Sequence, residues 1–271
     1  MIARRRHGPF IATLEHRRFV EFANAVRQNR YIGLCFGAAG VGKTLSARRY
    51  ANWDRANPTA LMSYRASKAA ERRIDAALAE SRTVFYTPSV SVTPATLRRD
   101  LKALLTTANT SVGLHLGQDP DAVGDDQAHI ELVIVDEADR LSHAALECAR
   151  DLFDRADFGL ILIGMPGIEK RMARYPQFYS RVGFAHHFHP LQGKDLSFVT
   201  THHCRKVCSG AGAGTPNAKA IATIARITGG NFRLLHRLLV QIERVLKINK
   251  LTAITVDVID AARSMLVIGA N

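Results

Sequence analysis

The sequence lacks the long apolar run that a membrane-spanning helix requires. No apolar segment approaches the roughly 18 residues of such a helix, and the amino terminus, MIARRRHGPF, has basic residues with no apolar segment behind them. We therefore expect neither a membrane-spanning segment nor a signal peptide.

Cysteine is also scarce. Four thiols in 271 residues do not make a disulfide framework, and they are typical of a protein in a reducing cytoplasm.

Acidic residues are outnumbered by basic ones. The chain has 24 Asp and Glu against 37 Lys and Arg, a net charge of +13 at pH 7. A folded protein this basic is expected to meet a polyanion: nucleic acid is the first candidate and an anionic membrane surface the second. Its length suits one large domain, or one domain with a small lid.

Short apolar runs rich in β-formers alternate with helical patterns over the first 190 residues. The runs cover residues 31–36, 83–87, 131–136, 158–164 and 183–188. The helical patterns cover residues 44–53, 66–80, 93–108 and 142–156. This alternation predicts an α/β fold, a parallel sheet flanked by helices on both faces.

After Pro190 the remaining patterns are all helical. They cover residues 193–207, 217–228, 230–248 and 255–266. We predict a basic arm and helix over 1–30, an α/β core over 31–190 and a helical lid over 191–271. Arg4, Arg5 and Arg6 form that arm or a disordered tail. We also expect an acidic loop over 117–126 and a glycine-rich loop over 209–216.

A glycine-rich loop follows the first apolar run. Residues 37–44 read GAAGVGKT and satisfy G-x-x-x-x-G-K-[ST] between a strand and a helix. Glycines allow backbone N–H groups to surround phosphate oxygens, and the helix beginning near Lys43 directs its positive end at them. Lys43 is expected to reach the β- and γ-phosphates, and the Thr44 hydroxyl to bind Mg²⁺. The predicted nucleoside triphosphate site comprises Gly37, Ala38, Ala39, Gly40, Val41, Gly42, Lys43 and Thr44.

Two carboxylates end the apolar run at 131–136. Asp136 is expected to hold Mg²⁺ through water, and Glu137 to orient and deprotonate the attacking water. An ordinary acidic helix start is the alternative. The letters DEAD at 136–139 are also typical of a family of RNA helicases, but that family needs two motor domains, so we expect no such helicase.

The order of these motifs resembles that of AAA+ ATPases. The strand LILIG follows the Asp-Glu pair, then come YPQFYSRVGF and a helical region that contains GGNFR. Within that class, the stretch LIGMPGIEKRM, YPQFYSRVGF and HPL most resembles the transposition regulators TniB, TnsC and MuB. The resemblance implies a P-loop NTPase fold with a helical lid, ATP and Mg²⁺ as cofactors, and hydrolysis of ATP to ADP and phosphate that is slow and dependent on assembly or DNA.

The resemblance also assigns residues. Arg181 matches the arginine finger that reaches a neighbouring subunit's γ-phosphate, with Arg174 as the second choice and an ordinary surface arginine as the alternative. Arg233 matches the sensor-2 arginine of the lid, which touches nucleotide in cis, unless it is a solvated helix residue. Met165 stands where many AAA+ proteins have a polar sensor-1 residue. A methionine cannot orient water, so this departure bears on the rate of hydrolysis.

Proteins of this type surround duplex DNA as a ring or helical filament and recruit a transposase, sometimes with a target-selection factor, and no membrane is involved. Arg98, Arg99 and Lys102 lie together on the helical pattern 93–108 and are candidate DNA contacts, although each alone fits a solvated helix face. Such contacts go mainly to phosphates and are weakly sequence-selective. Three alternatives stay open: an Orc/Cdc6- or DnaC-like initiator or helicase loader, an ExeA-like ATPase, and a nucleotide-binding scaffold.

Histidines and cysteines cluster between residues 186 and 208. Cys204 and Cys208 are four apart on a helical pattern, but the paired spacing of a structural zinc site is absent. A metal site is therefore the minor hypothesis, and partly buried thiols the major one. We expect Cys35 and Cys148 to lie in or near the core.

Overall fold

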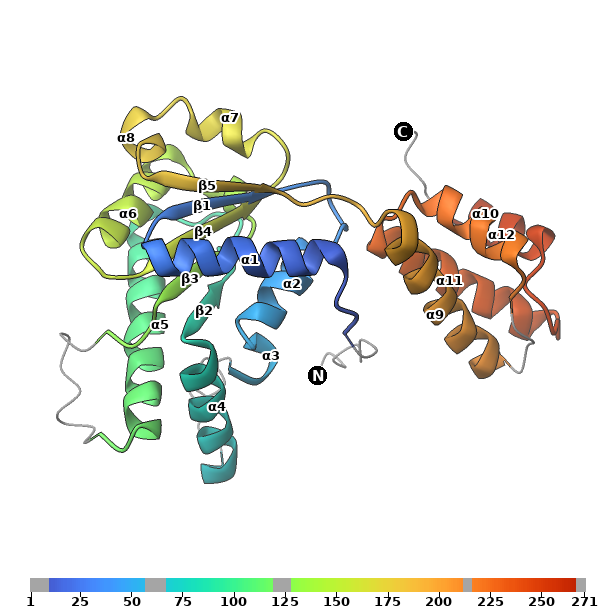
Figure 1. Ribbon diagram of the computed structural model, residues 1–271, viewed down its shortest axis with the longest axis horizontal. Coiled ribbons are helices and arrows are strands. Elements are labelled where there is room, and N and C mark those ends of the chain that lie inside the picture. The colour runs from blue at the N-terminus through green and yellow to red at the C-terminus, as the bar shows by residue number, and fades with distance from the viewer. Residues whose placement is uncertain (1–9, 57–66, 119–127, 212–215, 267–271) are drawn as a thin grey trace. The chain divides into compact units, whose positions relative to one another are not determined.

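The computed structural model describes residues 10–56, 67–118, 128–211 and 216–266 (Figure 1). These residues form two compact units. The core unit holds residues 18–39 and 43–188, and the lid unit holds residues 10–17, 40–42 and 189–266. Most of the predicted acidic loop and all of Arg4, Arg5 and Arg6 lie outside the described residues. In the parts of the chain that the structure describes, no helix is both long and apolar enough to cross a membrane.

The core unit is built on a five-stranded sheet in the order β2-β3-β4-β1-β5, with every neighbouring pair parallel. The strands are β1 (Ile32–Phe36), β2 (Thr83–Tyr86), β3 (Leu132–Val135), β4 (Gly159–Gly164) and β5 (Val182–His187). Four strands lie within predicted apolar runs and β5 begins one residue before its run at 183–188, so the predicted parallel α/β sheet is confirmed. Every residue of β3 and β4 is buried, as expected for central strands covered on both faces.

Helices connect and cover the strands of the core unit (Figure 1). They are α1 (Leu14–Asn29), α2 (Lys43–Tyr50), α3 (Trp53–Ala56), α4 (Lys68–Ser81), α5 (Pro94–His115), η2 (Ala138–Arg140), α6 (His143–Asp154), α7 (Ile168–Met172) and α8 (Pro176–Tyr179). On α1, Phe22 stacks on His186 of β5 with ring centroids 5.5 Å apart. This contact joins α1 to the edge strand of the sheet.

Two helical patterns differ from the prediction. The pattern at 44–53 is divided into α2 and α3, because Asn52 takes a left-handed conformation with φ of 51°. The pattern at 93–108 continues to His115, because Ala108, Ser111 and Val112 are buried against the rest of the unit. Packing there outweighs the weak helix propensity of a Thr- and Asn-containing stretch.

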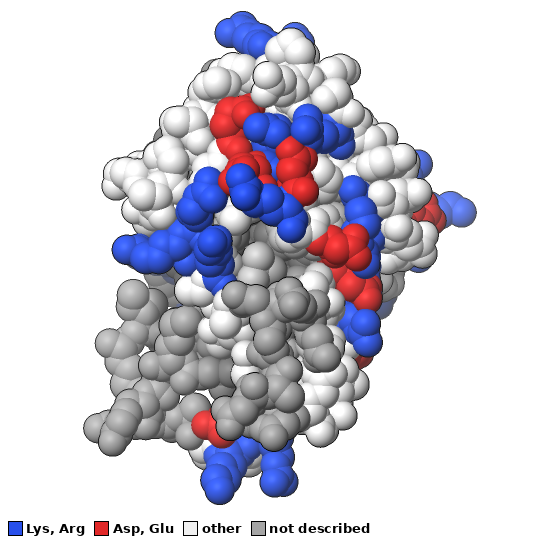
Figure 2. Space-filling view, turned by 90° about the vertical axis from the view of Figure 1, so that its left-hand side faces the viewer, with Lys and Arg blue, Asp and Glu red and all other residues white. Residues whose placement is uncertain are grey.

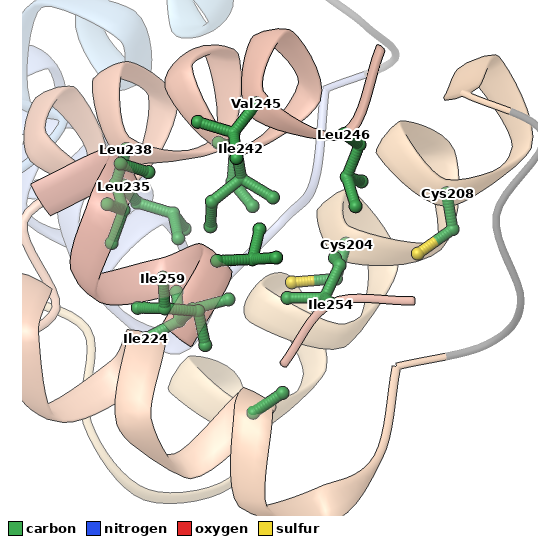
Figure 3. Packing of buried hydrophobic residues seen from close by; sticks show 14 of the residues in the cluster. Cys204, Cys208, Ile224, Leu235, Leu238, Ile242, Val245, Leu246, Ile254 and Ile259 are labelled. Carbon is green, nitrogen blue, oxygen red and sulfur yellow. The ribbon is translucent and has the colours of Figure 1, made fainter. Parts of the chain in front are cut away.

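Among the described residues after Pro190, four helices form the lid unit. They are α9 (Gly193–Ala211), α10 (Ala218–Thr228), α11 (Phe232–Ile248) and α12 (Val256–Ser264). Side chains of Asn217, Asn231 and Thr255 cap the last three at their N-termini. Buried side chains from all four helices meet in one apolar cluster (Figure 3). The predicted glycine-rich loop is shorter than expected, since residues 209–211 belong to α9.

Candidate functional site

The glycine-rich loop joins the end of β1 to the start of α2. Gly40 and Gly42 have φ of 81° and 117°, a left-handed backbone that glycine adopts without strain. Gly37 has a different constraint, because a Cβ at this position would lie 2.2 Å from the carbonyl oxygen of Phe188. The glycines of the predicted pattern are therefore required by the backbone of this loop.

Lys43 and Thr44 begin α2 and face different partners. The Lys43 ammonium donates hydrogen bonds to the carbonyl oxygens of Gly37 and, at 2.9 Å, Ala38. The Thr44 hydroxyl donates a 2.7 Å hydrogen bond to Asp136 Oδ2. A residue of the loop thus meets the carboxylate that follows β3, although 92 positions separate them in the sequence.

Asp136 is a buried carboxylate with 4% of its surface exposed. Burial raises its pKa, while the hydrogen bonds from the Thr44 hydroxyl and the Glu137 backbone N–H oppose that rise. A hydroxyl and a carboxylate oxygen are hard oxygen ligands of the kind Mg²⁺ takes, directly or through water. The pair Thr44 and Asp136 therefore fits a magnesium ion carried by a nucleoside triphosphate.

Glu137 has a strained backbone and a paired side chain. Its φ of 51° is left-handed, which is uncommon for a residue with a side chain. Its carboxylate forms an ion pair with Arg140, whose guanidinium also donates to the carbonyl of Pro88 at 2.7 Å. Arg140 was not among the predicted site residues. Its spacing of three from Glu137 was the only signal in the sequence.

A third carboxylate, Asp139 of η2, lies beside the end of β4. The backbone N–H of Met165 donates a 2.8 Å hydrogen bond to Asp139 Oδ2, and the Met165 side chain is 43% exposed. Asp139 therefore places a polar group beside the position where the resemblance expects one. The sequence contained it within DEAD, but only the fold shows its proximity to Met165.

Arg181 is held within its own chain. Its Nε lies 2.5 Å from Asp154 Oδ1, and its guanidinium also donates to the carbonyl of Gln177. Asp154 pairs with Arg150 as well, at 2.5 Å. Asp154 is a further residue that the motifs did not reveal, because this contact joins the end of α6 to the start of β5. Arg174, the second choice for the finger, is exposed.

Arg233 lies in the first turn of α11 in the lid unit. Asn231 caps this helix, and its Oδ1 accepts hydrogen bonds from the N–H groups of Arg233 and Leu234 at 3.0 and 3.1 Å. The Arg233 side chain is exposed. Its sensor-2 role stays a prediction.

The predicted DNA contacts on α5 are largely paired with acids. Arg98 lies 3.0 Å from Asp151, and Arg99 lies 2.9 Å from Asp100. Lys102 is exposed. Figure 2 shows the side of the core on which α5 and α6 lie, and there Asp and Glu lie among Lys and Arg over part of the surface, beside a group of Lys and Arg alone. The surface of α5 is thus less cationic than its sequence alone indicates.

Two cysteines of the 186–208 cluster pack into the interior of the lid unit, whereas His187 is exposed and His202 and His203 are half-buried. Cys204 and Cys208 point into the lid core (Figure 3), and burial raises the pKa of Cys204 to about 12. Metals bind the thiolate, so this environment favours a packing role. Among the described residues no group of three His, Cys, Asp or Glu could hold a metal ion. Cys35 and Cys148 are buried too.

Known proteins resemble this chain in sequence. A family model described as an AAA domain matches residues 26–172, more than half of the chain. A Staphylococcus aureus protein described as "Potential ATP-binding protein" is 39% identical over 272 residues, covering 96% of this chain and 97% of that protein.

Solved structures of the same fold include two proteins at low sequence identity. The Thermotoga maritima RuvB Holliday junction branch migration motor has a TM-score of 0.56 at 18% identity, over 96% of this chain and 71% of that one. The Aeropyrum pernix ORC1 protein, solved in complex with DNA, has a TM-score of 0.53 at 15% identity, over 92% and 64%. These likenesses show the fold, a P-loop parallel sheet flanked by helices. From the family match and the close relative, we conclude that the chain belongs to the AAA family.

Proposed function

We propose that this protein is an ATP-dependent, largely sequence-non-specific DNA-binding ATPase that regulates transposition. The observation that carries the ATPase proposal is the hydrogen bond from Thr44 to Asp136, because it brings the phosphate loop and the β3 carboxylate to one place. The relative named as a potential ATP-binding protein supports the choice of nucleotide. The net charge of +13 supports a polyanionic partner, and the ORC1 structure shows this fold in a DNA-bound protein.

In this proposal each residue of the site has a separate task. The loop amides and Lys43 bind the phosphates, and Lys43 exchanges its bonds to loop carbonyls for phosphate oxygens. Thr44 and Asp136 hold Mg²⁺, which when bound neutralises charge on the transferring phosphoryl group. Glu137 orients the attacking water and accepts its proton. To do so it must leave its ion pair with Arg140.

Assembly completes the site. We place Arg181 as the finger that stabilises charge on a neighbouring subunit's γ-phosphate, with Arg233 contacting nucleotide in its own subunit. Arg181 must then leave Asp154, so hydrolysis depends on contact between subunits. ATP-bound protomers assemble as a ring or filament on duplex DNA in the cytoplasm and recruit or activate a transposase, with or without a target-selection factor. Hydrolysis then disassembles them. The transposition role is supported by the resemblance at residues 162–191.

Three observations favour other functions. The exposed Met165 and the pairing of Glu137 with Arg140 favour a scaffold whose ATP is structural. The likeness to ORC1 favours a replication initiator or loader.

ATP turnover with and without duplex DNA tests the proposal. We expect duplex DNA to stimulate the wild type and Lys43→Ala to lose nucleotide binding and turnover. Glu137→Gln should bind ATP and lose turnover by about 10²–10⁴-fold. Arg181→Ala should also bind ATP and lose turnover. Arg174→Ala, the matched control, should keep both ATP binding and turnover. Wild-type protein that binds ATP without turnover in either condition would establish the scaffold instead. A transposition reaction in vitro then tests the regulatory role, since insertions should require this protein and ATP.

A further inference from the structure

The positive charge of the chain is concentrated in the lid. Residues 189–271 contain eleven Lys and Arg and four Asp and Glu, a net charge of +7 out of the total of +13. This segment is less than a third of the chain. The nucleotide site therefore does not account for the net positive charge of the lid.

The outward face of α11 carries a line of these cations. Its inward face, which includes Leu235, Leu238 and Ile242, is buried in the lid core (Figure 3). The exposed positions at spacings of three and four, which share one face of a helix, hold Arg233, Arg237, Val240, Arg244 and Lys247. From the helical rise, the line extends for about 20 Å.

Helix α9 adds further cationic side chains beside this face. It packs against α11, and its cations Arg205 and Lys206 are exposed, whereas His202 and His203 are half-buried. The pKa of His203 is lowered first by burial, and then by the charges of His202, Lys206 and His236, the last on α11. The two helices therefore contribute to one positive region.

Among the described residues, two arginines of this face have no acidic partner. Glu243 pairs with Lys247 at 2.7 Å. Within the described parts of the chain, no carboxylate forms an ion pair with Arg237 or Arg244. The α5 arginines differ, because Arg98 and Arg99 each have an acidic partner.

We propose that the exposed face of α11 and the adjoining cations of α9, here called the lid cationic face, bind the phosphates of duplex DNA. The choice of DNA rests on the proposed function, while the location rests on the charge and exposure of the lid. A line of cations on a straight helix suits a phosphate backbone, and such contacts carry no sequence information.

An acidic protein segment is the competing occupant. Val240 and Ile248 are 46% and 67% exposed, and with Glu243, Arg244 and Lys247 they line a shallow hollow of about 310 Å³. Apolar groups would suit a peptide better than a phosphate. The number of unpaired cations favours DNA, and the two occupants give different results in the test.

Fluorescence anisotropy with a labelled duplex and a slowly hydrolysed ATP analogue tests this proposal. The test variant is Arg237→Gln/Arg244→Gln, and the matched control is Lys219→Gln/Arg226→Gln, which removes the same charge from exposed positions of α10. Neither pair belongs to the nucleotide site, so ATP binding and the melting temperature should stay at wild-type values. We expect the test variant to weaken DNA binding at least about tenfold and to reduce the slope of log K against log salt by about 2. The control should stay within about twofold of wild type, since it only lowers net charge.

Equal weakening by both variants would overturn the proposal, because net charge would then explain the binding. Unchanged DNA binding by the test variant would also overturn it. If that variant instead lost binding to a poly-glutamate peptide, the face would be assigned to an acidic protein segment. Wild-type protein that bound no DNA would contradict the proposed function itself, whereas failure of the variants alone would leave that function in place.

Discussion

At the scale of single residues, the site depends on a carboxylate that the fold keeps away from water. Asp136 is buried and its raised pKa comes mainly from that burial. Ionised Asp136 therefore lowers the stability of the protein when no cation is present. A magnesium ion held by Asp136 and Thr44 would compensate that charge, which links nucleotide binding to stability.

This environment predicts a pH-dependent stability difference between the wild type and Asp136→Asn. The folded-state pKa of Asp136 lies above its unfolded value, so its favourable contribution is complete below about pH 4 and is lost as the pH rises through the folded pKa. The stability of the wild type relative to Asp136→Asn should therefore fall across that interval and then remain constant. The fall is about 1.4 kcal/mol for each unit by which the pKa is raised.

Urea denaturation at a series of pH values, without nucleotide or magnesium, measures this difference. Thr44→Val is the companion variant: it leaves the titrating group and removes a hydrogen bond that lowers the pKa of Asp136, so its stability relative to the double variant Thr44→Val/Asp136→Asn should fall by more. A difference between wild type and Asp136→Asn that stayed constant or grew with pH would show that Asp136 is not destabilised by ionisation.

The sequence identified the candidate site residues, but it did not predict the ion pairs that Glu137 and Arg181 form. The motif placed Thr44 and Asp136 together, and the structure has them in contact, because strand, loop and helix follow from local pattern. The ion pairs of Glu137 with Arg140 and of Arg181 with Asp154 were not foreseen. They depend on side-chain conformations and on which elements the fold brings together, which local pattern does not specify.

At the scale of elements, burial explains which predictions succeeded. Strands β1 to β4 were visible because each is a short apolar run, and burial on both faces requires such runs. The edge strand β5 was visible from its short β-rich run, although alternate residues of it are exposed. The short helices α7 and α8 were missed, since five and four residues are too few to show a helical period. The end of α5 was missed because its packing, and not its composition, keeps it helical.

A prediction at the scale of elements concerns the reactivity of Cys204 on helix α9. Cys204 has a pKa raised to about 12 by burial, and the thiolate is the reactive form of cysteine. In the native protein near pH 8, Cys204 should therefore resist N-ethylmaleimide, whereas all four thiols should react in guanidinium chloride. Mass spectrometry after peptide digestion distinguishes the sites. Rapid native labelling of Cys204 would show that the lid core opens readily or is packed differently.

At the scale of the whole molecule, the chain combines a P-loop core with a strongly basic lid. The fold class followed from alternating patterns and is confirmed by the AAA domain match and by the RuvB and ORC1 structures. Transposition, partner choice and subunit number do not follow from the fold, because one fold serves many functions. They depend on surfaces between molecules, which a single chain does not display.

In the proposed function, ATP drives assembly of this protein on duplex DNA. Electron microscopy of the purified protein with a slowly hydrolysed ATP analogue, with and without duplex DNA, tests it most directly. We expect rings or filaments on DNA that require the nucleotide and disappear with Lys43→Ala, with Arg181 at the contact between subunits. Particles that remain monomeric beside bare DNA would contradict the claim and leave no role for a finger acting between subunits.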